Sequence, residues 1–110
     1  MRFQLALSTL LLALPAAGCS GNVGQAGCED AVRAIGDVAV RCGFERQANE
    51  GVFEAHATAG RGCEGVVGLR DEEAFYEECL PSIESMTCAE FDDPEYVYPA
   101  SCNMQLNVRR

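Results

Sequence analysis

Residues 28–42 read CEDAVRAIGDVAVRC, and this stretch decides the fold that the sequence predicts. Its apolar residues recur at spacings of three and four, which places them on one face of a helix; they are Cys28, Ala31, Val32, Ile35, Val38, Ala39 and Cys42. Glu29 and Asp30 suit the positive N-terminal end of the helix dipole, Arg41 suits the C-terminal end, and Gly43 stands where helices commonly stop. The pattern therefore predicts a helix over 28–42 with a cysteine near each end.

A second helix is predicted to start at Asp71, a residue type that caps helix N-termini and is followed here by two glutamates. Pro81 removes one backbone hydrogen bond, so this helix either kinks there or restarts as a shorter one through Thr87. The residues expected on its inner face are Ala74, Phe75, Cys79, Ile83 and Met86.

The remaining segments show weaker patterns. Residues 44–70 contain five glycines and no clean apolar period, so we expect a loop with one extra helical turn around 53–58. The tail after Cys88 contains two prolines and is expected to be irregular, with Cys102 tying it to the rest of the domain. The sequence thus predicts a mainly α fold, a small disulfide-rich helical hairpin with long loops over residues 28–110.

Seven cysteines in a chain of 110 residues indicate an oxidising compartment. If the two helices pack antiparallel, Cys28 pairs with Cys88 and Cys42 pairs with Cys79, which leaves Cys63 for Cys102. A local bridge between Cys88 and Cys102 is the alternative, since six cysteines allow 15 connectivities.

The N-terminus predicts export and lipidation. Arg2, an apolar run over 3–14 and small residues up to Gly18 form a secretory signal, and the apolar run is shorter than the roughly 20 residues that span a bilayer. The segment LPAAGC, residues 14–19, resembles the bacterial lipobox, in which cleavage precedes a diacylated cysteine, although Ala16 replaces the usual leucine. The resemblance implies a signal peptide over 1–18, then a lipidated N-terminus and flexible tether over 19–27.

Cysteine parity supports lipidation of Cys19. If Cys19 carries lipid, the other six cysteines can all pair, whereas an ordinary signal with Cys19 as a seventh disulfide cysteine leaves one odd thiol. Two or more acyl chains give firm membrane attachment. Ser20 follows the anchor, and by the sorting rule of enteric lipoproteins this favours the outer membrane.

The composition and spacing argue against several activities. The chain carries 17 acidic and 8 basic residues, a net charge of −9, which disfavours nucleic acid as a partner. No two cysteines are closer than the eight intervening residues between Cys79 and Cys88, so redox, haem and structural-zinc motifs are missing. His56 is the only histidine and is expected to face solvent. We therefore expect a non-enzymatic protein that needs no cofactor.

The proline-containing loop after Cys88 offers two candidate sites. Asp92, Asp93 and Glu95 could hold calcium, or they could form a solvated acidic turn. The aromatic residues around them could anchor a protein partner, or they could cover the small core; they are Phe91, Tyr96 and Tyr98.

The whole chain resembles the short cysteine-rich lipoproteins of GC-rich Gram-negative bacteria. The resemblance rests on the lipobox, the Cys28–Cys42 segment, and Glu78-Cys79-Leu80-Pro81 leading to Cys88 and Cys102. It implies a membrane-anchored lipoprotein of the cell envelope that acts as a structural or binding module on a protein partner. The competing expectation is a secreted, disulfide-stapled inhibitor or effector-like module.

Overall fold

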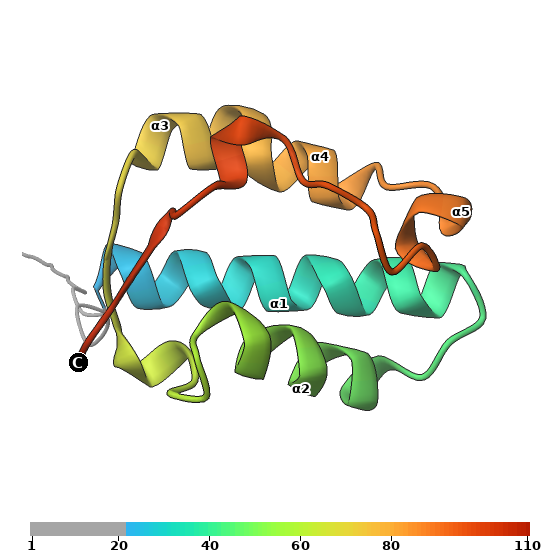
Figure 1. The fold of residues 1–110 in the computed structure, drawn as a ribbon, viewed down its shortest axis with the longest axis horizontal. Helices are drawn as coiled ribbons and strands as arrows, with labels where there is room; N and C mark the ends of the chain where they lie inside the picture. Colours follow the sequence, from blue (N-terminus) through green and yellow to red (C-terminus); the bar gives the residue numbers. More distant parts are fainter. Residues whose placement is uncertain (1–21) are drawn as a thin grey trace, which may run out of the picture.

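The computed structural model describes residues 22–110, so the predicted signal peptide and Cys19 lie outside the described residues. The chain is mainly helical, which confirms the predicted fold class (Figure 1). In chain order the elements are α1 (Val23–Arg41), α2 (Arg46–Ala57), η1 (Cys63–Gly65), β1 (Val66–Leu69), α3 (Glu72–Ala74), η2 (Phe75–Cys79), α4 (Leu80–Glu84), α5 (Cys88–Phe91), η3 (Ala100–Cys102) and β2 (Leu106–Val108). Within this part of the chain, no helix is long and apolar enough to cross a membrane.

The central helix α1 has a well-defined cap at each end. At its start, Asn22 Oδ1 accepts a hydrogen bond from the amide of Gln25 at 2.7 Å. At its end, Gly43 adopts a φ of +85°, and the amide of Phe44 donates to the carbonyl of Ala39 at 2.7 Å. This is the Schellman arrangement that a glycine after the last turn favours. The predicted helix and its stop at Gly43 are confirmed.

The predicted start of α1 was five residues too late, and the expected tether over 20–27 was wrong from Val23 onward. The glycines of this stretch serve close packing. A Cβ on Gly24 would lie 2.3 Å from the amide nitrogen of Gly68 in β1, and one on Gly27 would lie 3.0 Å from a methyl of Leu69. The first turns of α1 therefore lie directly on β1, because these positions lack side chains.

Helix α2 occupies a segment that was expected to be mostly loop, and that expectation was wrong. Glu45 caps its start by accepting from the amides of Gln47 and Ala48, which lowers the pKa of the Glu45 carboxyl. The helix runs back along α1, antiparallel to it (Figure 1). Arg46 contacts Asp37 and Glu50, and the Arg46–Glu50 pair covers Gly36 of α1. Polar side chains thus form part of the helix contact, which weakens the apolar pattern of α2.

The end of α2 provides a stability prediction. Ala59 adopts a φ of +53° directly after the C-cap Thr58, a position that favours glycine. Because a left-handed backbone costs an alanine roughly 1 kcal/mol, Ala59→Gly is expected to raise the free energy of unfolding by about 0.5–1 kcal/mol. Chemical denaturation of both proteins measures the change, and a destabilised variant would contradict this geometry.

The predicted second helix forms a continuous helical segment from α3 through η2 to α4. Asp71 caps it as expected, accepting from the amide of Ala74 at 3.0 Å. The π-helical turn η2 immediately precedes α4, and it widens the backbone where the ring of Pro81 would crowd the carbonyl four residues earlier. The segment ends at Glu84 rather than Thr87. Thr87 instead forms a capping box with Glu90 at the start of α5.

The segment α3–η2–α4 runs parallel to α1 (Figure 1), and this direction explains the disulfide pairs. Cys28 binds Cys63, Cys42 binds Cys88, and Cys79 binds Cys102. Every pair expected from the sequence, including the local Cys88–Cys102 alternative, was wrong. The reason is α2, because an unexpected helix returns the chain to the start of α1 before α3 begins. The expectation that these six cysteines all pair is confirmed.

The C-terminal tail is more ordered than expected. It contains η3 and the short strand β2, which pairs antiparallel with β1 and places Val108 opposite Val66 and Leu106 opposite Leu69. The main core lies between α1 and the η2–α4 segment. Its buried members are Ala31, Ala34, Ile35, Val38, Phe75, Cys79, Ile83 and Met86.

Candidate functional site

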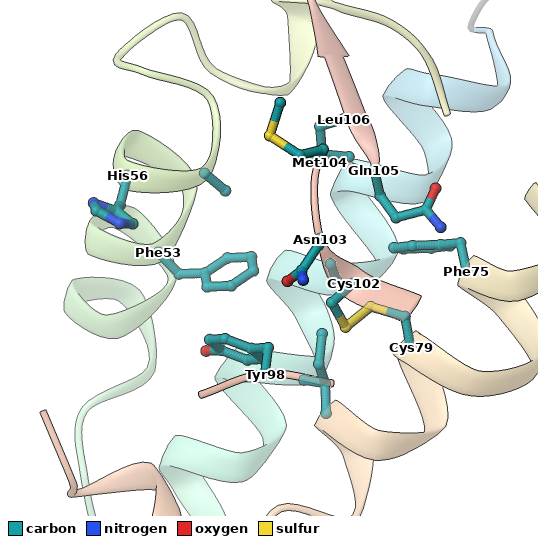
Figure 2. Close-up of a pocket in the computed structure, with 13 residues that line it drawn as sticks. Phe53, His56, Phe75, Cys79, Tyr98, Cys102, Asn103, Met104, Gln105 and Leu106 are labelled. Atoms are coloured by element: carbon teal, nitrogen blue, oxygen red, sulfur yellow. A yellow bond between two sulfur atoms is a disulfide. The ribbon is translucent and has the colours of Figure 1, made fainter. Parts of the chain in front are cut away.

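A groove of about 410 Å³ lies between α2 and the C-terminal segment 98–106, and it is the candidate site (Figure 2). Its floor is formed by core side chains, including Phe75 and Ile83, which are almost fully buried. Phe53 projects from α2 into the groove, and Tyr98 lies across from it. The volume falls within the roughly 300–1,000 Å³ range of small-ligand pockets, and the lining is mostly apolar, as in most of them.

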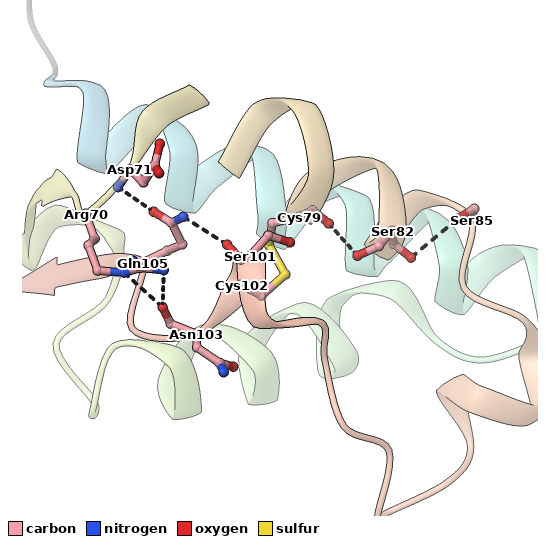
Figure 3. Close-up of a disulfide and its surroundings, with 9 residues drawn as sticks. All are labelled: Arg70, Asp71, Cys79, Ser82, Ser85, Ser101, Cys102, Asn103 and Gln105. Atoms are coloured by element: carbon pink, nitrogen blue, oxygen red, sulfur yellow. Dashed lines mark hydrogen bonds between the residues drawn. A yellow bond between two sulfur atoms is a disulfide. The ribbon is translucent and has the colours of Figure 1, made fainter. Parts of the chain in front are cut away.

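The C-terminal wall of the groove is held at several points (Figure 3). Gln105 is 3% exposed, accepts from the amide of Asp71 at 3.0 Å and donates to the carbonyl of Ser101 at 2.9 Å. The guanidinium of Arg70 donates through Nε and a terminal nitrogen to the carbonyl of Asn103 at 3.2 and 3.0 Å. These bonds fix the backbone on both sides of Met104.

Met104 lies at the edge of the groove and is 83% exposed. Its backbone adopts a φ of +55°, a left-handed conformation that is uncommon for residues other than glycine. The disulfide between Cys79 and Cys102 ties the same wall to η2, and both cysteines line the groove (Figure 2). An apolar side chain is thus held in solvent by a fixed backbone.

The groove lining contributes two titratable side chains, His56 and Tyr98. Tyr98 packs edge-on against Tyr96, with ring centroids 5.1 Å apart. Burial, and to a smaller extent the neighbouring Tyr96, raises the pKa of Tyr98 above its ordinary value. Tyr98 therefore remains an uncharged phenol at neutral pH. His56 is exposed as expected, although it lies on α2 rather than in a loop.

The aromatic residues predicted to bind a partner pack largely against the protein itself. Phe91 lies 5.5 Å from Phe44, centroid to centroid, and Phe91, Tyr96 and Tyr98 all pack on the main core. This matches the alternative that they cover the core, and of the three only Tyr98 lines the groove. Sequence reasoning missed Phe53 and Met104, because the groove joins segments about 50 positions apart in the chain and no local pattern marks either one.

The acidic turn after α5 does not gather metal ligands. Asp92 is the C-cap of α5, and Asp93 Oδ1 accepts from the amide of Glu95 at 2.9 Å. Nowhere in residues 22–110 do three or more histidine, cysteine, aspartate or glutamate side chains converge as a metal site would require. Asp92, Asp93 and Glu95 are all exposed in this turn.

A tyrosine outside the groove gives a pH prediction. The Tyr76 hydroxyl donates to Asp30 Oδ2 at 2.9 Å, and burial, followed by this hydrogen bond and the charge of Asp30, raises the pKa of Tyr76 to about 12 from 10.0. The folded-state pKa is the higher one, so the contribution of Tyr76 to stability is complete below pH 10.0 and is lost as the pH rises toward 12. Because the pKa of Tyr98 is raised as well, we expect two tyrosines to ionise late when tyrosinate absorbance is followed, with Tyr76 the later of the two.

The matched variant for this titration is Asp30→Asn. It removes the negative charge beside Tyr76 while burial remains, so the late ionisation should move only part of the way toward pH 10.0. Unchanged titration in Asp30→Asn would show that the Tyr76–Asp30 contact does not form in solution.

The chain matches no protein-family model, and it has no significant match among curated proteins or solved structures.

Proposed function

We propose that this protein is a lipid-anchored module of the bacterial cell envelope that works without catalysis, by binding a protein partner in the groove beside Met104. The observation that carries the proposal is the exposed Met104 at the edge of an apolar groove, where hydrogen bonds hold the backbone on both sides of it. Methionine adapts its shape to apolar partners, and exposed apolar groups beside a groove are typical of interaction sites. The partner that fits inserts an apolar side chain between Phe53 and Tyr98.

The three disulfides support the extracytoplasmic part of the proposal, because paired cysteines persist in oxidising compartments. The lipobox-like segment with Cys19 supports the anchor, and Ser20 favours the outer membrane of a Gram-negative bacterium. The net charge of −9 favours a partner with a basic contact region.

Complementation of a strain that lacks the protein tests this proposal, with detergent sensitivity of the envelope as the readout. Met104→Arg places a charge at the groove and is expected to fail. Val97→Arg is the matched control, because Val97 is 82% exposed, as Met104 is 83% exposed, but does not line the groove; it is expected to restore resistance. Immunoblots of membrane fractions confirm equal amounts of both variants.

Three results count against parts of the proposal. Full resistance with Met104→Arg contradicts the groove as the contact site. Restoration by Cys19→Ala, which cannot be lipidated, favours the secreted inhibitor instead of the anchored module. Detergent sensitivity that is unchanged in the strain lacking the protein removes the main support for a role in envelope integrity.

A further inference from the structure

The two methionines in the described chain differ in their access to solvent. Met104 is 83% exposed at the edge of the groove, whereas Met86 is 2% exposed and belongs to the main core. The remaining methionine of the sequence, Met1, lies in the predicted signal peptide. Within residues 22–110, Met104 therefore carries the only thioether that is open to solvent.

Few other side chains in this part of the chain compete with Met104 for an oxidant. The six cysteines of residues 22–110 all form disulfides, so none of them offers a thiolate. The sequence contains no tryptophan. Since thiolates and thioethers are the side chains that peroxides oxidise most readily, a peroxide that reaches the described surface reacts first at Met104.

The backbone on both sides of Met104 keeps its side chain at the groove edge. Arg70 donates to the carbonyl of Asn103 at 3.0 and 3.2 Å, and Gln105, which is 3% exposed, is hydrogen-bonded through both ends of its side-chain amide. The side chain of Met104 lies beside Leu106, and both residues line the groove (Figure 2). A chemical change at the Met104 sulfur therefore alters the lining of the groove directly.

We propose that Met104 is an oxidation site at which a peroxide makes the groove edge polar and so lowers the affinity of the groove for its protein partner. This inference rests on the proposed function, because it concerns regulation of the same groove. In the reaction, a lone pair of Met104 Sδ attacks one oxygen of hydrogen peroxide, the O–O bond breaks and an S–O bond forms. The departing hydroxide takes the proton of the transferred oxygen, so the sulfur loses two electrons and the peroxide is reduced to water.

The sulfoxide that results is a poor neighbour for an apolar partner. Its oxygen accepts hydrogen bonds, and an apolar side chain of the partner offers no donor to replace the water that solvates this oxygen. Desolvation of the oxygen is expected to weaken partner binding about tenfold. Enzymes that reduce methionine sulfoxide use two thiols, which form a disulfide as the oxygen leaves as water, so the change is reversible.

The site of oxidation is tested on the full chain extracted from membranes. The protein is treated with hydrogen peroxide and cut after glutamate, which separates the two methionines because Glu90 and Glu95 lie between them. Mass spectrometry then follows the gain of one oxygen at each methionine. Met104 is expected to react at least about tenfold faster than the buried Met86, and equal rates would overturn the proposal.

The effect on function is tested by complementation, with detergent resistance as the readout. Met104→Gln gives the groove edge a polar side chain resembling the sulfoxide and is expected to fail. Val97→Gln is the matched control, because Val97 is 82% exposed but does not line the groove, and it is expected to restore resistance. Restoration by Met104→Gln would overturn the switch.

Peroxide treatment of the cells tests the switch itself. The resistance of each strain after treatment is divided by its resistance before treatment. This ratio should fall further in cells with the unmodified protein than in cells lacking the protein or carrying Met104→Leu, which cannot form a sulfoxide. An equal fall with the unmodified protein and with Met104→Leu would overturn the switch.

The variant Met104→Arg separates the failure of the two proposals. If Met104→Arg fails to complement while Met104→Gln restores resistance, the switch is overturned and the groove remains the contact site. If both variants restore resistance, the groove and the switch are both overturned.

Discussion

Replacing Cys28 and Cys63 together by alanine is expected to lower the free energy of unfolding by about 4 kcal/mol or more. The two cysteines are 35 positions apart, and for a loop of this length the chain-entropy model gives about 4 kcal/mol. Both side chains are buried, so their loss also removes packing in the small cluster that contains Val66. Small domains have only about 5–15 kcal/mol of stability, so much of it would be lost.

The matched control is Cys42→Ala/Cys88→Ala. These cysteines are 46 positions apart, so the entropic cost is again about 4 kcal/mol. They are more exposed than the first pair, and little packing is lost. Urea denaturation of the two double variants, followed by circular dichroism, should rank the Cys28/Cys63 variant as the less stable. A cost below about 1 kcal/mol for that variant would contradict the Cys28–Cys63 bridge.

Gly24→Ala is expected to lower the free energy of unfolding by about 2 kcal/mol. The new Cβ would lie 2.3, 2.6 and 2.7 Å from backbone atoms of Gly68, and backbone in a strand cannot move aside cheaply. Overpacking of this kind costs up to about 3 kcal/mol, and the better helix propensity of alanine returns about 1 kcal/mol. The clash therefore outweighs the propensity.

Gly51→Ala is the control for this substitution. Gly51 lies within α2 with nothing within 4 Å of the added Cβ, so only the propensity gain of about 1 kcal/mol should appear. Urea denaturation should thus move the two variants in opposite directions. Stabilisation by Gly24→Ala would show that α1 and β1 do not touch at Gly68.

Apolar spacing predicted α1 because its buried face is built from alanine, valine and isoleucine. It failed for α2, which has no fully buried residue and contacts α1 partly through Arg46 and Glu50. Glycines suggested a flexible segment before Cys28, yet Gly24 and Gly27 permit close packing there. The local sequence does not show that a distant segment packs against these positions and leaves no room for a side chain.

The candidate site was less predictable than the fold. Tyr98 could be chosen from its aromatic character, and it does line the groove. Phe53 and Met104 could not be chosen from the sequence. They line the same groove only because the unexpected α2 positions Phe53 and because Gln105, through its bonds with Asp71 and Ser101, positions the segment that carries Met104. The predicted disulfide pairs were wrong for the same reason. The pairing depends on whether the helices run parallel or antiparallel, and the missed helix α2 reverses the direction of the segment that follows it.

The most direct test of the account is the intact mass of the protein extracted from membranes in detergent, after free thiols have been blocked. We expect a chain that begins at Cys19, carries acyl mass and shows no blocked thiol, because six cysteines form the three disulfides. An unlipidated chain, or one with blocked thiols, would contradict the lipid-anchored, disulfide-stapled module.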